Sequence, residues 1–347
     1  MQTKTFKYKQ PFLLACGEEL PEIEITYSTF GKINEAGDNI IWVCHALTAN
    51  SVVTEWWPGL FGERDYFDPD RYFVICANML GSRYGSTYAL SENPKTGSPY
   101  YHDFPNITVR DMIRAYDLLR ESLGISRIRL ILGGSMGGQQ ALEWAIEKPE
   151  LFEFLIPIAT NARHSPWGIA FNEAQRMSIE ADGSWKEKCA TAGMDGMRAA
   201  RATALLSYRG YHAYVTSQLD DTDEKIDDFK AMSYQRYQGE KLARRFDAFA
   251  YWTLSKAMDS HNIGRGRGGI ENALRSIRAK TCVIGLSSDI LFPTSEQKIM
   301  ADGVSESEFI EIDSPFGHDG FLVETEKLGE AISQYLRRHG WKSGKVT

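Results

Sequence analysis

The feature that most constrains this chain of 347 residues is a glycine-rich turn between an apolar run and a helix-like segment. The run Arg127-Ile-Arg-Leu-Ile-Leu132 leads into Gly133-Gly-Ser-Met-Gly-Gly138, and the helix-like QQALEWAIEK follows. A strand that turns sharply at a serine and leaves as a helix exposes that serine, because small neighbours let the backbone adopt a strained conformation. The turn therefore predicts that Ser135 is a nucleophile. A dinucleotide-binding loop is the rival interpretation, but no G-x-G-x-x-G pattern fits residues 133–138.

Short apolar runs rich in β-branched residues recur on both sides of this turn. The expected buried strands are 40–44, 72–76, 128–132, 154–158, 281–286 and 309–312. Continuous apolar runs are typical of strands buried on both faces, as in a parallel sheet that helices cover. Helix-like stretches such as 109–123 and 137–148 alternate with these runs. The pattern predicts an α/β fold with a mostly parallel sheet flanked by helices.

The prolines indicate where this alternation is interrupted. All 12 lie at or before Pro166 or at or after Pro293. Much of the proline-free part is rich in helix-forming residues, and its aromatic side chains are expected to pack between helices. We therefore expect a helical lid domain at 164–268, inserted into a core domain that 1–163 and 269–347 form together.

Composition argues against several other classes of protein. The 39 Lys and Arg residues against 46 Asp and Glu residues give a net charge of −7, which does not favour nucleic-acid binding. The apolar runs are too short for a membrane span, and the polar N-terminus predicts no signal peptide and a cytoplasmic protein. Five cysteines without a CxxC pair are expected to be reduced. Seven scattered histidines without HExxH spacing predict no metal site.

Two later segments supply the partners that a serine nucleophile needs. Asp289 and His318 each stand just past a predicted strand. The order Ser, Asp, His is that of the α/β-hydrolase fold, in which these groups meet at the carboxyl ends of strands. We expect His318 to accept the proton of Ser135 and Asp289 to hold the imidazole tautomer. Asp313, upstream in the same loop as the histidine, is the alternative acid.

Acyl transfer at such a serine also requires two backbone N–H donors for the oxyanion. Met136, the residue after the nucleophile, provides one of them, and the second is expected in the loop after the strand 40–44. Leu47 is the predicted donor in that loop, with Ala46 as the alternative. His45 is expected to be structural.

These residues resemble the homoserine O-acetyltransferases, a family of the α/β-hydrolase fold. The resemblance covers almost the whole chain and consists of several spaced motifs in one order. The motifs are His45–Asn50, Tyr72–Asn78, Gly85–Thr87, Asn93–Tyr100, Phe104-Pro105, Asp111-Met112, the glycine-rich turn Gly133–Gly138 (the elbow) with Leu142–Trp144, and Ser314–Phe321.

The resemblance implies a reaction and a set of substrate-binding residues. The family moves the acetyl group of acetyl-CoA to the hydroxyl of L-homoserine, in methionine biosynthesis, through an acyl-serine intermediate. It has a helical lid over a tunnel, forms a homodimer through the lid and binds no cofactor. A lid arginine of the family binds the carboxylate of the amino acid; Arg209 looks like its match, with Arg201 nearby. Asp319 looks like the ligand of the substrate ammonium.

Three positions depart from the family pattern, and they leave alternatives open. Tyr88-Ala89 stands where the family commonly has Gly-Pro, Ala49 where it has glycine, and Gln139 where it has methionine. Relatives on the same scaffold use succinyl-CoA as the donor or serine as the acceptor. An esterase or thioesterase would share the triad. A binding scaffold without activity is the least favoured interpretation, because the Ser, Asp and His residues stand intact and in order.

Overall fold

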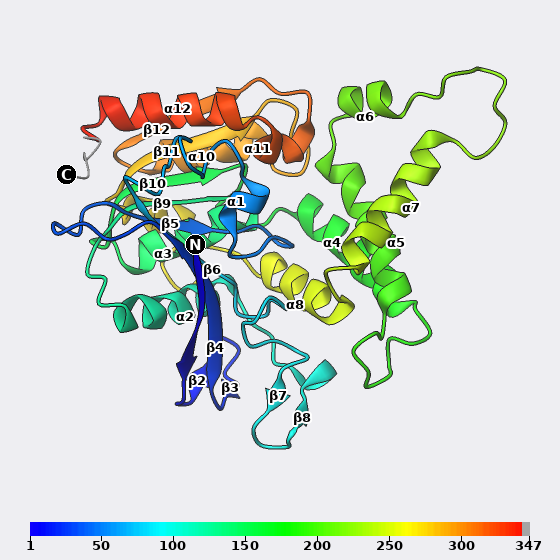
Figure 1. Cartoon of the computed structure of the whole chain (residues 1–347), viewed down its shortest axis with the longest axis horizontal. Helices are drawn as coiled ribbons and strands as arrows, with labels where there is room; N and C mark the ends of the chain where they lie inside the picture. Colours follow the sequence, from blue (N-terminus) through cyan, green and yellow to red (C-terminus); the bar gives the residue numbers. More distant parts are fainter. Residues whose placement is uncertain (342–347) are drawn as a thin grey trace.

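A mostly parallel sheet of eight strands forms the centre of the protein, of which the computed structural model describes residues 1–341 (Figure 1). Its strands, in spatial order, are β1 (Gln2–Tyr8), β4 (Ile23–Phe30), β6 (Phe73–Ala77), β5 (Ile40–Cys44), β9 (Ile128–Gly134), β10 (Phe152–Ile158), β11 (Lys280–Leu286) and β12 (Ser307–Ile312). β4 is antiparallel to both β1 and β6, and the strands from β6 to β12 are parallel. Two pairs of two-residue strands, β2 (Phe12–Leu13) with β3 (Glu19–Leu20) and β7 (Glu92–Asn93) with β8 (Ser98–Pro99), lie outside this sheet.

The six strands expected from the sequence are all present, and the predicted α/β fold is confirmed. The strands β1 and β4 were not expected. β1 is largely exposed, and β4 buries alternate residues, so neither forms the continuous apolar run of a strand covered on both faces.

Helices cover both faces of the sheet because its central strands are apolar on both sides. Along β5, Ile40, Trp42 and Cys44 belong to one buried cluster, and Ile41 and Val43 belong to the other. The first cluster includes α2 (Val109–Ser122), α3 (Met136–Glu147), α9 (Ile270–Arg275) and α10 (Thr294–Gly303). The second includes α1 (Val53–Trp56), α11 (Gly320–Val323) and α12 (Thr325–Arg338). The period-2 alternation of a strand thus distributes one run of five residues over two cores.

Five helices fill the segment between β10 and α9. They are α4 (Pro166–Glu180), α5 (Met194–Tyr208), α6 (Tyr211–Gln218), α7 (Lys230–Ala243) and α8 (Ala248–Asp259). In Figure 1, α5, α6 and α7 lie to one side of the sheet, and α8 lies between them and the sheet. α8 is buried along most of its length, so it attaches the helical segment to the core. No helix within residues 1–341 has the length and the apolarity to cross a membrane.

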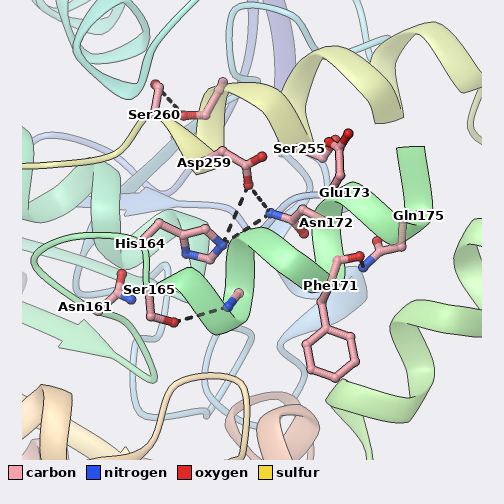
Figure 2. A network of polar contacts seen from close by, with 12 residues as sticks. Asn161, His164, Ser165, Phe171, Asn172, Glu173, Gln175, Ser255, Asp259 and Ser260 are labelled. Atoms are coloured by element: carbon pink, nitrogen blue, oxygen red, sulfur yellow. Dashed lines mark hydrogen bonds and ion pairs between the residues drawn. The ribbon is translucent and has the colours of Figure 1, made fainter. Parts of the chain in front are cut away.

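A buried polar network joins the first and the last helix of this segment. Figure 2 shows His164, Asn172 and Asp259 pointing toward one another. The amide nitrogen of Asn172 donates to Asp259 Oδ1 at 2.8 Å and lies 3.2 Å from His164 Nε2. Burial lowers the pKa of His164 to about 3, so the imidazole is neutral and can accept at Nε2. Asn172 therefore supplies donors to both α8 and the loop before α4.

Replacing Asn172 by alanine should destabilise this junction. The substitution removes both hydrogen bonds and leaves the half-buried carboxylate of Asp259 and the buried imidazole of His164 each short of a donor, which costs about 1–3 kcal/mol of the free energy of unfolding. Urea denaturation would measure the loss. The control is Gln334→Ala at an exposed position of α12, which should change the free energy of unfolding by less than about 0.5 kcal/mol. An Asn172→Ala protein as stable as the wild type would contradict the role of the network.

Candidate active site

Ser135 stands at the sharp turn between β9 and α3. Its φ of 56° and ψ of −125° are strained for a residue with a side chain, and the surrounding contacts must hold this conformation. The glycines around it permit those contacts. A Cβ at Gly137 would lie 2.1 Å from the carbonyl oxygen of Cys44, and one at Gly133 would lie 2.5 Å from the backbone of Gly137. The helix α3 can therefore begin directly against the end of β5.

Three side chains form a hydrogen-bonded chain at this turn. His318 Nε2 lies 2.8 Å from Ser135 Oγ, and His318 Nδ1 lies 2.7 Å from Asp289 Oδ2. The other carboxylate oxygen, Asp289 Oδ1, accepts the backbone N–H groups of Leu291 at 2.8 Å and Phe292 at 2.9 Å. All three members of the chain are buried. The structure thus brings together the three side chains predicted as a triad, with each in position for proton transfer from serine to imidazole.

Asp313, the alternative acid, does not contact the imidazole. It is exposed, and its carboxylate accepts the hydroxyl of Ser287 at 3.0 Å. Since Asp289 occupies Nδ1 of His318, the geometry favours Asp289 as the orienting carboxylate.

Aromatic rings enclose the imidazole of His318. Phe292 stacks on it with centroids 5.0 Å apart and planes at 29°. Phe321 and Tyr208 lie at centroid distances of 5.3 and 5.8 Å. These rings come from three different elements, so the imidazole has one orientation and little contact with water.

The N–H groups of the two predicted oxyanion donors have no acceptor among the backbone hydrogen bonds of the described residues. Met136 is the first residue of α3, where the N–H groups have no partner within the helix and the helix dipole favours negative charge. Within residues 1–341, the backbone hydrogen bonds of loops, turns and caps include none from the N–H of Met136 or from the N–H of Leu47. Leu47 and the alternative donor Ala46 line the same cavity as Ser135.

A cavity of about 410 Å³ opens over Ser135 and His318. The core contributes the loop after β5 and the segment around Asp319, and the helical segment contributes residues of α5 and α7. Three basic side chains lie in its lining, namely Arg201, Lys241 and Arg245. Three larger hollows, of about 780, 520 and 500 Å³, contain none of the three triad side chains, so we assign the chemistry to the smaller cavity.

The two predicted ligands of the amino acid contact each other. Arg209 Nε lies 2.8 Å from Asp319 Oδ2. Asp319 lines the cavity, but Arg209 is not among its lining residues, and Arg201 is. The guanidinium of Arg201 lies 5.4 Å from the ring centre of Tyr208.

In the sequence, Lys241 and Arg245 belong to a local basic group with Arg244 whose simplest interpretation is a solvated helix face, and Arg201 entered the interpretation only as a neighbour of Arg209. The sequence contained a signal for Arg201. It stands two helical turns before Tyr208, so the two side chains are expected on one face of the helix. For Lys241 and Arg245 the signal was this concentration of basic residues, which could help hold an anionic cosubstrate. Their approach to the triad could not be predicted, because it depends on how the helices fold back. The described residues contain no group of three or more His, Cys, Asp or Glu side chains that could hold a metal ion.

The sheet, the serine turn and the Ser–His–Asp chain together define a protein of the α/β-hydrolase fold, and a family model described by that name matches residues 39–325. The chain is 49% identical to a homoserine O-acetyltransferase of Cyclobacterium marinum, over 98% of this chain and 97% of the other. It is 43% identical to a homoserine O-acetyltransferase of Chlorobaculum parvum, over 97% and 95% of the two chains. The chain belongs to the homoserine O-acetyltransferases, which confirms the resemblance seen in the sequence.

Solved structures agree with this assignment. The homoserine O-acetyltransferase of Bacillus anthracis superposes with a TM-score of 0.90 at 26% identity, over 99% of both chains. Esterase E22 superposes with a TM-score of 0.88 at 24% identity, over 96% of this chain and 99% of the other, and this likeness is one of fold.

Proposed function

We propose that the protein transfers the acetyl group of acetyl-CoA to the side-chain hydroxyl of L-homoserine, through an acyl intermediate on Ser135. The observation that carries the proposal is the Ser135–His318–Asp289 chain, which opens into a cavity lined by basic side chains. Family membership supports the choice of substrates. The reaction would serve methionine biosynthesis in the cytoplasm.

In the first half-reaction, His318 Nε2 takes the hydroxyl proton as Ser135 Oγ attacks the thioester carbonyl. The carbonyl oxygen becomes an oxyanion, which receives hydrogen bonds from the N–H groups of Met136 and Leu47. One such donor contributes roughly 3 kcal/mol to transition-state stabilisation. The intermediate collapses as the C–S bond breaks, and CoA leaves as a thiol with the proton from the imidazolium.

In the second half-reaction, homoserine takes the place of CoA. His318 removes the proton of the homoserine hydroxyl, whose oxygen attacks the acyl-serine carbonyl. The same two N–H groups stabilise the second tetrahedral intermediate, and Ser135 recovers its proton when the acyl–oxygen bond breaks. Since α5 and α7 form one wall of the cavity, the helical segment acts as a lid that keeps water from the acyl-enzyme.

The charged groups of the cavity suit an amino acid and an anionic donor. Arg201 is our proposed partner for the homoserine carboxylate, because a guanidinium binds a carboxylate bidentately. Asp319 is the proposed partner for the ammonium, and its ion pair with Arg209 supports a positioning role for that arginine. Lys241 and Arg245 carry the charge to receive the phosphates of CoA.

The decisive assay measures CoA release from acetyl-CoA or succinyl-CoA, with and without L-homoserine or L-serine. We expect release that requires acetyl-CoA and L-homoserine, with O-acetylhomoserine identified by mass. Ser135→Ala should abolish it, and Asp289→Asn should lower kcat about 10⁴-fold because the imidazole is left in the wrong tautomer.

The matched control is Asp313→Asn, an exposed carboxylate in the loop of His318, which should stay near wild-type activity. Release without an amino acid would make the protein a thioesterase. A preference for succinyl-CoA or for serine would replace the donor or the acceptor in the proposal.

Arg201 and Arg209 can be separated by the KM for homoserine. Arg201→Ala should raise this KM about 10–100-fold, because a hydrogen-bonded charge pair contributes about 1.5–3 kcal/mol, and it should leave the KM for acetyl-CoA nearly unchanged. Arg201→Lys should recover part of the loss, since lysine keeps the charge but not the bidentate geometry. A larger effect of Arg209→Ala on the homoserine KM than of Arg201→Ala would restore Arg209 as the carboxylate ligand.

We further propose a homodimer formed through the helical segment. Exposed apolar side chains concentrate in the stretch from the end of α5 to α7. They are Leu206, Tyr211, Val215, Leu219, Ile226, Phe229, Met232 and Tyr237. Such a concentration is typical of a protein interface.

Sedimentation should give twice the chain mass of 39.2 kDa, and the double variant Tyr211→Glu with Val215→Glu should give the mass of one chain. Ile299→Glu, at an exposed apolar residue of α10, is the control that should stay dimeric. A wild-type monomer would refute the proposal.

A further inference from the structure

The two proposed oxyanion donors are directed by the carbonyls of their own peptide groups. In a planar trans peptide, N–H and C=O point in opposite directions. The N–H of Leu47 shares its plane with the C=O of Ala46, and the N–H of Met136 shares its plane with the C=O of Ser135. Whatever holds these two carbonyls therefore sets the direction of the two donors.

On the elbow side, the helix itself holds the carbonyl. The oxygen of Ser135 accepts the backbone N–H groups of Gly138 at 2.9 Å and Gln139 at 3.2 Å. The first turn of α3 thus fixes the Met136 donor without help from a side chain.

On the side of the β5 loop, the ring of His45 holds the carbonyl. His45 Nδ1 lies 2.9 Å from the oxygen of Ala46, which also accepts the N–H of Ala49 at 3.0 Å. The other ring nitrogen, Nε2, accepts the backbone N–H of Met79 at 3.1 Å. These partners require a neutral ring with its hydrogen on Nδ1. Burial lowers the pKa of His45 to about 4, which keeps the ring neutral at physiological pH.

A buried amide links the two sides. Gln140 Nε2 donates to the carbonyl of Met136 at 3.0 Å and to the carbonyl of His45 at 3.2 Å. Its two amide hydrogens suit these two carbonyl oxygens, and the weak acceptor Met79 Sδ also lies 3.0 Å from the same nitrogen. Oε1 accepts the hydroxyl of Tyr116 at 3.0 Å. The reversed amide would place Oε1 against two carbonyl oxygens, so the hydrogen-bond network determines the orientation. The side chain is fully buried and holds the start of the β5 loop against the start of α3.

We propose that His45 and Gln140 are positioning residues. They fix the directions and the spacing of the two oxyanion donors, the N–H groups of Leu47 and Met136, before substrate binds. The proposal rests on the proposed roles of Ser135, Met136 and Leu47. Preorganised donors stabilise the transition state without reorganising during the reaction, so an error in their spacing lowers the rate of acylation more than it lowers substrate binding.

The neighbouring Gln139 provides a matched control. It is also fully buried and lies on the same helix, but its side-chain Nε2 donates to Asn161 Oδ1 at 3.1 Å and not to either oxyanion loop. A methionine at either position keeps the length of the side chain and removes its donors. A general loss of packing would affect both variants, whereas a loss of oxyanion positioning would affect only Gln140→Met.

The test compares p-nitrophenyl acetate with its thiono analogue, in which sulfur replaces the carbonyl oxygen. In both, Ser135 Oγ attacks the carbon, the ester C–O bond breaks, and nitrophenolate is released and measured. Sulfur accepts hydrogen bonds weakly, so an intact hole favours the oxygen ester. We expect Gln140→Met to lower the ratio of the two kcat/KM values about tenfold, with the KM for acetyl-CoA nearly unchanged. Gln139→Met should leave the ratio unchanged.

An unchanged ratio in a folded Gln140→Met protein would overturn the proposal. If that variant does not fold, Tyr116→Phe removes only a hydroxyl, which lies 3.0 Å from Gln140 Oε1 and 3.1 Å from the carbonyl oxygen of Ala77, and the ratio should fall about threefold. An unchanged ratio of the two kcat/KM values in Tyr116→Phe would also overturn the proposal. Ser135→Ala distinguishes a failure of the proposed function from a failure of the positioning role. Nitrophenolate release that survives Ser135→Ala would defeat the proposed function itself, whereas release that is lost there, with an unchanged ratio in Gln140→Met, would defeat only the positioning role.

Discussion

The structure around the serine depends on one contact between backbones, that of α3 with the end of β5. A side chain at Gly137 would meet the carbonyl oxygen of Cys44 at 2.1 Å, so only glycine permits this approach. Because the two chain segments touch, the Gln140 amide can reach both the loop that bears Leu47 and the start of α3. The strained turn at Ser135 persists because this contact and the first turn of α3 hold it.

The sequence was most informative where one residue type alone meets a physical requirement. The glycines of the turn at Ser135 meet such a requirement, and the apolar run of β5 is typical of a strand covered on both faces. The order of Ser135, Asp289 and His318 is characteristic of the α/β-hydrolase fold, and together with these features it made the fold class predictable. The edge strands β1 and β4 were not, since strands exposed on one side alternate polar with apolar residues and lack a continuous run.

The direction of a side chain near a helix end is also hard to predict from sequence, as Arg209 shows. It is the residue after α5, with φ −100° and ψ 136°, so its backbone has left the helix and its side chain turns to Asp319. Arg201 stays on the helix and lines the cavity. Two arginines eight positions apart thus differ in direction because the helix ends between them, and the exact end of a helix is the least predictable feature of a sequence.

Three buried histidines occupy structural positions around the site. Burial lowers the pKa of His45 and His261 to about 4 and that of His164 to about 3. An ordinary imidazole changes its charge between pH 5 and 8. Burial holds the pKa values of these three rings below that range, so the imidazoles stay neutral through it. The hydrogen bonds that these rings make to the framework around the nucleophile therefore do not depend on a change of imidazole charge.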